Sequence, residues 1–389
     1  MKVRVPNTSV FVVDSTYQLL NAVEAVHFLA PEKSYLVILK AEGPAREAFW
    51  PVISLKPWNG IRFLTPDINT DGCDFRILGP RLNAIVRAIY SRFQHLMLLL
   101  RVARTIKSLS GAENLFLGHY WLGPKDLMRH FANRLEHRTL YLLDDGTDTI
   151  DTNDRRRQMV NIVHNARASA STARQPIWNS VIEFLRRKYW MLDTKESEVI
   201  TFFSTYEIKV RNGDHLIRND YRLLRSIAAE ATRVDEVYFL GQCLVDDAYM
   251  EERVYLEYLR EILVHYEGRK IYYVAHPRES STMLARVRDL GGFELKRFKF
   301  PIEYELTVGG ILPTTLASFF CSALESCFQI LGGKVEIMGF YLDPSHLLKM
   351  HDIVAKTYAY FERRKSPGFA IIRLGLDRQG ARCIAGSSE

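Results

Sequence analysis

Apolar and polar positions follow one another along this chain in two patterns, short continuous apolar runs and longer stretches of helical periodicity. Short β-branched apolar runs predict strands, and apolar residues recurring every three or four positions predict helices. The expected strands are Ser9–Val13, Tyr35–Leu39, Asn114–Leu117, Thr139–Leu143, Val199–Phe203, Glu236–Leu240, Lys270–Val274 and Lys334–Gly339. The expected helices are Tyr17–Leu29, Leu82–Ser108, Pro124–Arg134, Trp178–Trp190, Met250–Tyr266 and Ser280–Leu290. Strands separated by helices predict an α/β fold with parallel sheets covered on both faces.

A change of pattern marks a domain junction. The stretch from Lys209 to Arg233 is polar, charged and helix-like, and a new strand begins at Glu236. We therefore expect two doubly wound α/β domains, residues 1–228 and residues 229–389. Because ligands of such sheets bind beyond the carboxyl ends of the strands, candidate functional residues are sought at those ends.

Composition narrows the class of protein. The 389 residues are 47% hydrophobic and 25% charged, which is typical of globular domains and excludes disordered, collagen-like and coiled-coil proteins. The net charge of +7 favours an anionic partner such as a nucleotide, acidic glycan, nucleic acid or membrane surface. The five cysteines lack metal-ligand spacing and fit a reducing compartment. We find no secretory signal and no apolar run near the ~20 residues of a membrane span, so we expect a cytoplasmic protein.

The first strand is followed by residues that suit a ligand-binding helix start. Ser15 or Thr16 can cap the next helix, and Gln18 and Asn21 lie near its beginning. A helix N-terminus can receive an anion or a hydroxyl-rich ligand. The alternative is a plain helix cap without a ligand.

Two adjacent carboxylates follow the strand Thr139–Leu143. Side chains of neighbouring strand residues point to opposite faces, so Asp144 and Asp145 cannot both face one ligand. We expect one of them to act as a base and the other to anchor the loop, with Gly146 permitting the sharp turn. An ordinary acidic turn is the alternative. The acidic residues here match neither a D-x-D motif nor a calcium loop, which argues against a metal site.

A third candidate lies where the strand Lys270–Val274 becomes a loop. Pro277 favours an extended conformation for His276, which can donate to a phosphate, and Arg278 adds positive charge. The alternative is a purely structural histidine. Further on, small and hydroxyl residues between Gly309 and Ser318 precede an apolar run, which predicts a phosphate-holding helix N-terminus or a simple turn.

Taken in order, these clusters resemble the motifs of the bacterial sialyltransferases. Asp144-Asp145-Gly146 matches a D/E-D/E-G motif, His276-Pro277 an HP motif, and Thr314–Ser318 a Ser/Thr motif. The opening Ser15–Ala25 looks like the first strand and helix of the lipooligosaccharide sialyltransferase and polysialyltransferase group. Phe239–Gln242 resembles the strand and glycine loop that begin a nucleotide domain. The resemblance covers roughly residues 9–345, in motifs of two to five residues.

The resemblance implies a GT-B fold, two Rossmann-like domains facing a central cleft, with the last helix packing back on the N-terminal domain. The N-terminal domain would serve the acceptor and the C-terminal domain the CMP donor. It implies an inverting, metal-independent transfer of sialic acid or a related nonulosonic acid to a hydroxyl of a surface glycan: lipooligosaccharide, capsule or O-antigen. No cofactor is expected.

The resemblance also assigns roles to residues. Asp145 would be the general base, and His276 would contact the donor phosphate and stabilise the leaving group. The implied donor-binding residues are Gly241, Gln242, Pro277, Arg278, Glu303, Pro313, Thr315 and Ser318. The implied acceptor-side or supporting residues are Ser15, Thr16, Gln18, Asn21, Asp144 and Gly146. Related enzymes often carry two adjacent hydroxyl residues in the last motif, whereas here Phe319 follows Ser318, so the choice among Thr314, Thr315 and Ser318 for the phosphate stays open.

Other functions stay open beside this one. The donor could be CMP-Kdo or another CMP-nonulosonate, because the motifs do not specify the sugar. A basic nucleic-acid-binding protein is a rival, although the chain has no nucleic-acid motif, so we expect no nucleic-acid partner. A non-catalytic relative is another rival, against which the presence of Asp145 and His276 argues. The acceptor, the linkage, polymerisation and the oligomeric state, a homodimer included, are not determined.

Basic amphipathic segments suggest a surface role. Arg81–Lys107 and Leu185–Trp190 combine basic and apolar residues, so they could dock on an anionic inner membrane that carries a glycolipid acceptor. The alternative is a solvated helix face over an aromatic core stripe. The stretch from Arg155 to Arg174 is expected to be a polar loop near the acceptor side.

Overall fold

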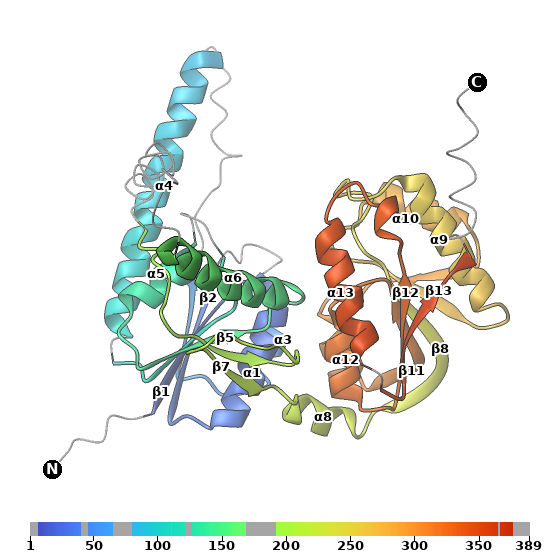
Figure 1. Cartoon of the computed structure of the whole chain (residues 1–389), viewed down its shortest axis with the longest axis horizontal. Coiled ribbons are helices and arrows are strands. Elements are labelled where there is room, and N and C mark those ends of the chain that lie inside the picture. Colours follow the sequence, from blue (N-terminus) through green and yellow to red (C-terminus); the bar gives the residue numbers. More distant parts are fainter. Residues whose placement is uncertain are drawn as a thin grey trace. The chain divides into compact units, whose positions relative to one another are not determined.

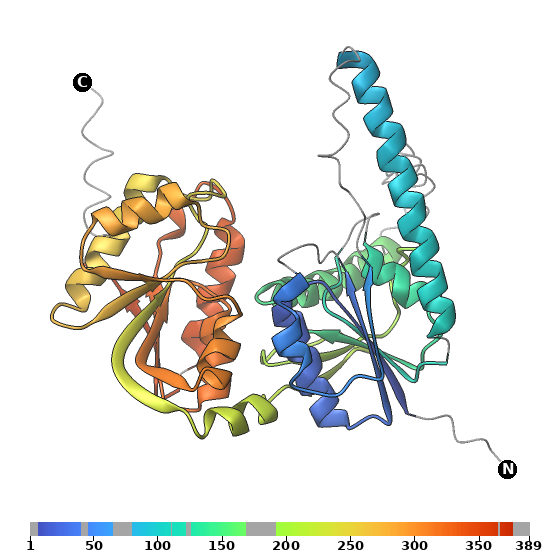
Figure 2. The same ribbon diagram turned by 180° about the vertical axis from the view of Figure 1, so that it is seen from behind.

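The computed structural model describes residues 7–39, 46–64, 80–109, 111–121, 126–168, 192–364 and 366–375. The chain divides into two compact units, Met1–Asn219 and Asp220–Glu389 (Figures 1 and 2). Each unit is built around one parallel sheet.

The N-terminal unit holds a seven-stranded parallel sheet in the order β3-β2-β1-β4-β5-β6-β7. Its strands are β1 (Thr8–Val13), β2 (Lys33–Leu39), β3 (Gly60–Leu64), β4 (Asn114–Leu117), β5 (Thr139–Leu143), β6 (Thr201–Ser204) and β7 (His215–Arg218). Its helices are α1 (Thr16–Leu29), α3 (Trp50–Ile53), α4 (Pro80–Ser108), α5 (Leu127–Arg134) and α6 (Asp148–Ala168). The strand order reverses between β1 and β4, which is where ligands bind in doubly wound sheets.

The C-terminal unit repeats this topology with a six-stranded parallel sheet in the order β10-β9-β8-β11-β12-β13. Its strands are β8 (Thr232–Leu240), β9 (Ile271–Val274), β10 (Phe293–Lys296), β11 (Ile311–Ser318), β12 (Glu336–Tyr341) and β13 (Phe369–Arg373). Its helices are α8 (Arg222–Ala228), α9 (Glu252–His265), α10 (Ser281–Asp289), α11 (Ile302–Val308), α12 (Ala323–Leu331), the short 3-10 helix η1 (Pro344–His346) and α13 (His351–Arg363). Here the order reverses between β8 and β11.

These two sheets confirm the expected fold class, an α/β protein with two Rossmann-like domains as in the GT-B fold. The central cleft stays a prediction. The units divide between Asn219 and Asp220, earlier than the expected junction after residue 228. The reason is that α8 packs against α11 and α12 of the C-terminal unit. The last described helix, α13, contacts η1 and β13 of its own unit, and its packing on the N-terminal domain stays a prediction.

Three local predictions are corrected. The stretch from Lys209 to Arg233 contains the strand β7 as well as α8. The segment Ile311–Ser318, expected to lead into a helix, is strand β11, because it lies between β8 and β12 with most of its residues buried, although Ile311 is exposed and Thr314 is half-buried. Arg155–Arg157 lie in helix α6 rather than in a loop, and α6 carries Asp148 and Asp151 in its first turn, where acidic groups stabilise a helix. Residues 169–191, with Arg174, the expected helix Trp178–Trp190 and Leu185–Trp190, lie outside the described residues.

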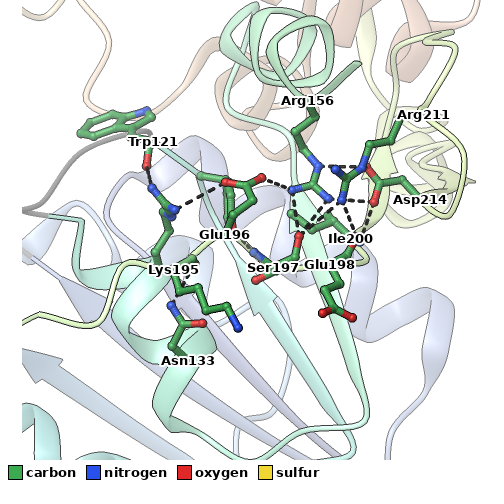
Figure 3. Close-up of polar contacts among 12 residues, drawn as sticks. Trp121, Asn133, Arg156, Lys195, Glu196, Ser197, Glu198, Ile200, Arg211 and Asp214 are labelled. Atoms are coloured by element: carbon green, nitrogen blue, oxygen red, sulfur yellow. Dashed lines mark hydrogen bonds and ion pairs between the residues drawn. The ribbon is translucent and has the colours of Figure 1, made fainter. Parts of the chain in front are cut away.

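A buried ion-pair network holds α6 to the chain segments that lead into β6 and β7 (Figure 3). The Arg156 guanidinium lies 2.8 Å from Asp214 and also pairs with Glu196. Arg211 contacts the second oxygen of Asp214 at 3.0 Å. The two positive charges therefore offset the cost of burying the Asp214 carboxylate. Among the described residues, no helix is both long and apolar enough to cross a membrane.

Candidate functional site

The two carboxylates after β5 have different surroundings. Asp144 is fully buried, and its carboxylate accepts hydrogen bonds from the Ser204 hydroxyl at 2.5 Å and the Thr205 amide at 2.6 Å. Asp144 thus ties the end of β5 to the end of β6. Asp145 is half-buried, and Gly146 has a φ of 63°, a left-handed conformation that favours glycine.

Asp145 is held by the first turn of α1. The Gln18 side-chain amide donates to Asp145 at 2.9 Å, and its oxygen accepts from the Asp14 amide at 2.9 Å. Ser15, rather than Thr16, is the helix cap, because its hydroxyl accepts from the Gln18 amide at 3.2 Å. Burial raises the pKa of Asp145 to about 6, although the hydrogen bond from Gln18 opposes the shift. This carboxylate can accept a proton near neutral pH.

Asn21 connects the same turn to two other strand ends. Its amide nitrogen donates to the Asp144 carbonyl at 3.1 Å, and its oxygen accepts from Asn219 at 3.1 Å. Gln18 and Asn21 are both buried. The structure therefore brings Gln18, Asn21, Asp144 and Asp145 together, and their roles stay a prediction.

His119, which the sequence reasoning missed, lies on the loop after β4. Its ring is buried between Asp14, at 3.6 Å, and Asp126, at 3.4 Å. Although burial opposes protonation, the nearby carboxylates of Asp126 and Asp14 raise the pKa of His119 to about 9. The resulting positive charge acts to lower the pKa of Asp145. Trp121 stacks on His119 with ring centroids 3.9 Å apart. The signal available in the sequence was a Gly-His pair directly after an expected strand.

In the C-terminal unit, His276 lies just beyond β9, and its ring is held in one tautomer. Its Nδ1 accepts from the Arg278 amide at 3.3 Å and lies 3.1 Å from the Cys243 sulfur. Because Nδ1 is the acceptor, Nε2 carries the proton of the neutral ring. Burial and the charge of Arg278 lower the pKa of His276. The ring is thus a neutral N–H donor, suited to an anionic oxygen.

Glu279, a second residue missed from the sequence, fixes the backbone of this loop. Its carboxylate accepts from the His276 amide at 2.6 Å and from the Tyr273 hydroxyl at 2.5 Å. The Tyr273 hydroxyl also lies 2.8 Å from that of Tyr255, which accepts from the Gln242 amide at 3.4 Å. Burial raises the pKa of Glu279 to about 7. These hydrogen bonds connect the loop after β8 to the loop after β9.

The loop after β8 carries Gly241 and Gln242. A Cβ at Gly241 would lie 2.5 Å from the Tyr273 hydroxyl, so only glycine leaves room for the network. The Gln242 side-chain oxygen is buried without a hydrogen-bond partner within the described part of the chain. Such an oxygen can accept a hydrogen bond from a ligand. Donor binding by Gly241 and Gln242 stays a prediction.

The other predicted donor-binding residues differ in exposure and in their hydrogen-bond partners. Arg278 is exposed and its guanidinium pairs with Asp247 at 2.9 Å, while the Pro277 carbonyl accepts from Arg297 at 3.0 Å. Glu303 is buried in the first turn of α11 and accepts from the Ser326 hydroxyl of α12. Its carboxylate is thus committed inside the unit, and burial raises its pKa.

The hydroxyl residues of the segment Thr314–Ser318 lie in a strand, and not at the helix N-terminus that we expected. Pro313 and Thr315 lie within β11, and Thr315 is paired with Val237, about 10 Å before the carboxyl end of the strand. Ser318 is at that end, but it is fully buried and donates to the Leu240 carbonyl at 2.8 Å. The Thr314 hydroxyl bonds to the Glu236 carbonyl at 3.0 Å. The physical reason is that these hydroxyls pack inside a central strand.

Ser322 is the hydroxyl at the beginning of the following helix. It is the N-cap residue of α12, directly after the turn that leaves β11, and its side chain makes no capping hydrogen bond. The sequence signal is a serine directly before the apolar run of α12.

No group of three potential metal ligands occurs among the residues that the structure describes, and metal independence stays a prediction. A cavity of about 420 Å³ lies on the N-terminal unit, lined by Asp154, Arg157, Gln158, Lys209, Val210, Arg211 and Asn212. It contains none of the predicted site residues.

No protein-family model matches the sequence, and no curated protein matches it. Solved structures resemble it loosely. The UDP-GlcNAc 2-epimerase of Methanocaldococcus jannaschii, in complex with UDP-GlcNAc and UDP, is 8% identical with a TM-score of 0.46, covering 93% of this chain and 96% of that one. CalG4, the calicheamicin glycosyltransferase, is 10% identical with a TM-score of 0.43, covering 96% of this chain and 86% of that one. TcCGT1 in complex with UDP is 10% identical with a TM-score of 0.47, covering 95% and 85%. Likeness at this level carries no argument about activity.

Proposed function

We propose that this chain is an inverting, metal-independent glycosyltransferase that moves sialic acid or a related nonulosonic acid from a CMP donor to a hydroxyl of a bacterial surface glycan. The observation that carries the proposal is the position of the two motif residues, because Asp145 lies just beyond β5, where it is held by Gln18, and His276 lies just beyond β9, where its Nδ1 accepts from the Arg278 amide. The pKa of Asp145 is raised to about 6, and the pKa of His276 is lowered, so the pair supplies a base and a neutral donor. The order of the motifs supports the choice of donor.

In this reaction Asp145 takes the proton of the acceptor hydroxyl as its oxygen attacks the anomeric carbon of the donor. The bond from that carbon to the phosphate oxygen breaks, and CMP leaves with the electron pair. One displacement inverts the anomeric configuration. A general base of this kind contributes about 10²- to 10⁴-fold to the rate. Gln18 orients the Asp145 carboxylate, and His119 balances its charge.

The leaving phosphate gains negative charge, and His276 is the donor that we assign to it. A preorganised N–H stabilises developing charge without reorganisation of solvent. Glu279 keeps His276 in place through the loop backbone. In place of Thr315 or Ser318, we assign the phosphate hydroxyl contact to Ser322, because it lies at the start of α12, where backbone N–H groups favour an anion.

The test is CMP release from a panel of CMP-nonulosonates, CMP-Kdo included, with a galactoside acceptor and with EDTA. We expect release that survives EDTA and that falls by about 10² or more in Asp145→Asn and His276→Ala. Asp289→Asn is the matched control, because Asp289 on α10 is exposed and is not among the groups that shift the pKa of Asp145. Ser322→Ala should raise the KM for the donor, and Ser318→Ala should mainly lower stability.

Other results would redirect the assignment. Release from CMP-Kdo alone would change the sugar but retain the mechanism. Release from UDP-sugars alone would refute the CMP donor. Absence of release, together with no thermal protection by CMP, would refute the transferase, and salt-sensitive oligonucleotide binding would then favour the nucleic-acid alternative.

A further inference from the structure

Helix α4 presents one face to the core of its own unit. Leu98, Val102 and Thr105 of α4, and Leu109 directly after it, are all at most 6% exposed. Their spacing of four, three and four residues places them on one side of the helix. This face anchors the C-terminal half of α4 against the sheet.

The opposite face of α4 is also apolar, and it is exposed. Ile89, Phe93, Leu96 and Leu100 are 65%, 57%, 38% and 51% exposed. They repeat the spacing of four, three and four residues, so they form a narrow stripe about 180° around the helix from the buried face. The N-terminal part of α4 extends past the sheet of its unit (Figures 1 and 2). A surface helix needs only one apolar face for its own core, so this second stripe calls for a partner.

The charge of α4 indicates which partner. Between Pro80 and Ser108 the sequence contains no acidic residue, and its basic residues are Arg81, Arg87, Arg92, Arg101, Arg104 and Lys107. By helical spacing, Lys107 lies in line with the exposed stripe and Arg104 lies beside it, and both are exposed. An apolar stripe with basic residues along it and no acidic ones is typical of a helix that lies in the headgroup region of an anionic bilayer.

We propose that the outer face of α4, defined by Ile89, Phe93, Leu96 and Leu100 with Arg104 and Lys107, docks on an anionic lipid bilayer. The apolar side chains enter the boundary between headgroups and acyl chains, and the basic side chains bind lipid phosphates. A second copy of this chain fits less well, because it would bring two acid-free basic faces together. Docking of this kind does not depend on the proposed transferase activity, and it would bring a transferase to acceptors that are anchored in lipid.

The test is co-sedimentation with vesicles of phosphatidylcholine, and with vesicles of equal parts phosphatidylcholine and phosphatidylglycerol. We expect the protein to bind the anionic vesicles, with binding weakened by salt. The double variant Ile89→Gln, Phe93→Gln should lower the partition coefficient by about tenfold or more, since it removes two apolar side chains from the interface. Arg104→Gln, Lys107→Gln should reduce the preference for phosphatidylglycerol.

Val264→Gln is the matched control, because Val264 on α9 is 67% exposed, as much as Ile89, and should leave vesicle binding unchanged. Equal binding of the wild type and the Ile89, Phe93 variant would overturn the proposal. So would a wild type that ignores the vesicles but forms a dimer that this variant abolishes, because a second copy would then cover the stripe. Vesicle binding is measured without donor or acceptor, so loss of the transferase assignment would not affect it.

Discussion

Replacing Gly118 by alanine would disturb the candidate base without touching it. A Cβ at this position would lie 1.9 Å from the Gln18 side-chain oxygen, 2.4 Å from its Cδ and 3.0 Å from its Cγ. The Gly118 amide donates to the Val12 carbonyl at 2.8 Å, so the backbone is held in the sheet. Gln18 is only 1% exposed. The side chain of Gln18 must therefore move, and its hydrogen bonds to Asp145 and to the Asp14 amide must break.

The expected cost combines two effects. Overpacking of a buried site costs about 1 to 3 kcal/mol, and loss of a hydrogen bond to a charged group costs about 1.5 to 3 kcal/mol. Because the side chain can relax in part, we expect the free energy of unfolding to fall by about 2 to 4 kcal/mol. The hydrogen bond from Gln18 lowers the pKa of Asp145, so its loss should raise that pKa further. The acid limb of the kcat/KM profile should then move to higher pH.

The assay is urea unfolding together with the pH profile of CMP release. The three closest atoms to the added Cβ all belong to Gln18, so Gln18→Ala should remove the overlap. Adding Gly118→Ala to Gln18→Ala should cost little, and the two single changes should be strongly non-additive. A Gly118→Ala protein of unchanged stability and unchanged pH profile would refute the reasoning, as would simple additivity with Gln18→Ala.

Three further outcomes are expected. The pKa of Asp145 is about 6 in the folded protein against 3.8 in the unfolded chain, so its contribution to stability is present below pH 4 and lost as the pH rises through 6. In denaturant melts, the free energy of unfolding of Asp145→Asn should equal that of the wild type at pH 4 and exceed it by at most about 3 kcal/mol at pH 8. Glu279→Gln should displace the His276 loop and lower kcat by about 10- to 100-fold in steady-state CMP release, and an unchanged kcat would show that Glu279 does not position His276. Arg156→Met leaves Asp214 buried with one cation fewer, so thermal and urea unfolding should show a loss of about 3 kcal/mol, and a neutral effect would contradict the ion-pair account.

The central strands were predictable, and the short edge strands were not. Asn114–Leu117 and Thr139–Leu143 have the bounds that the apolar runs predicted, because a strand buried on both faces must be continuously apolar. The edge strands β3, β7 and β10 have several partly exposed residues, so their sequences carry no clear apolar run. The hydroxyl residues of Ile311–Ser318 resemble a helix start, whereas they lie in a central strand in which Thr315 and Ser318 are buried.

The candidate site was predictable only in part. Asp145 and His276 follow strands that the sequence revealed, so the carboxyl ends of those strands pointed to them. His119 also follows an expected strand, but nothing in the local sequence shows that two carboxylates surround it, and Glu279 carries no local signal. His119 becomes a candidate site residue because β4 lies between β1 and β5, and this strand order brings Asp14 beside it. Glu279 matters because its carboxylate turns back to the amide of the His276 loop.

The sequence by itself determined two parallel α/β sheets, most of their central strands and the polar loops that follow those strands. It could do so because burial of a strand and the start of a helix are recorded in neighbouring residues. Only the tertiary structure decided that Asp144 binds the end of β6 while Asp145 stays half-buried. It also decided that the Ser318 hydroxyl donates to the Leu240 carbonyl and that α4 has two apolar faces. These outcomes depend on strand order and on burial, which set hydrogen bonding and protonation between residues that are far apart along the chain.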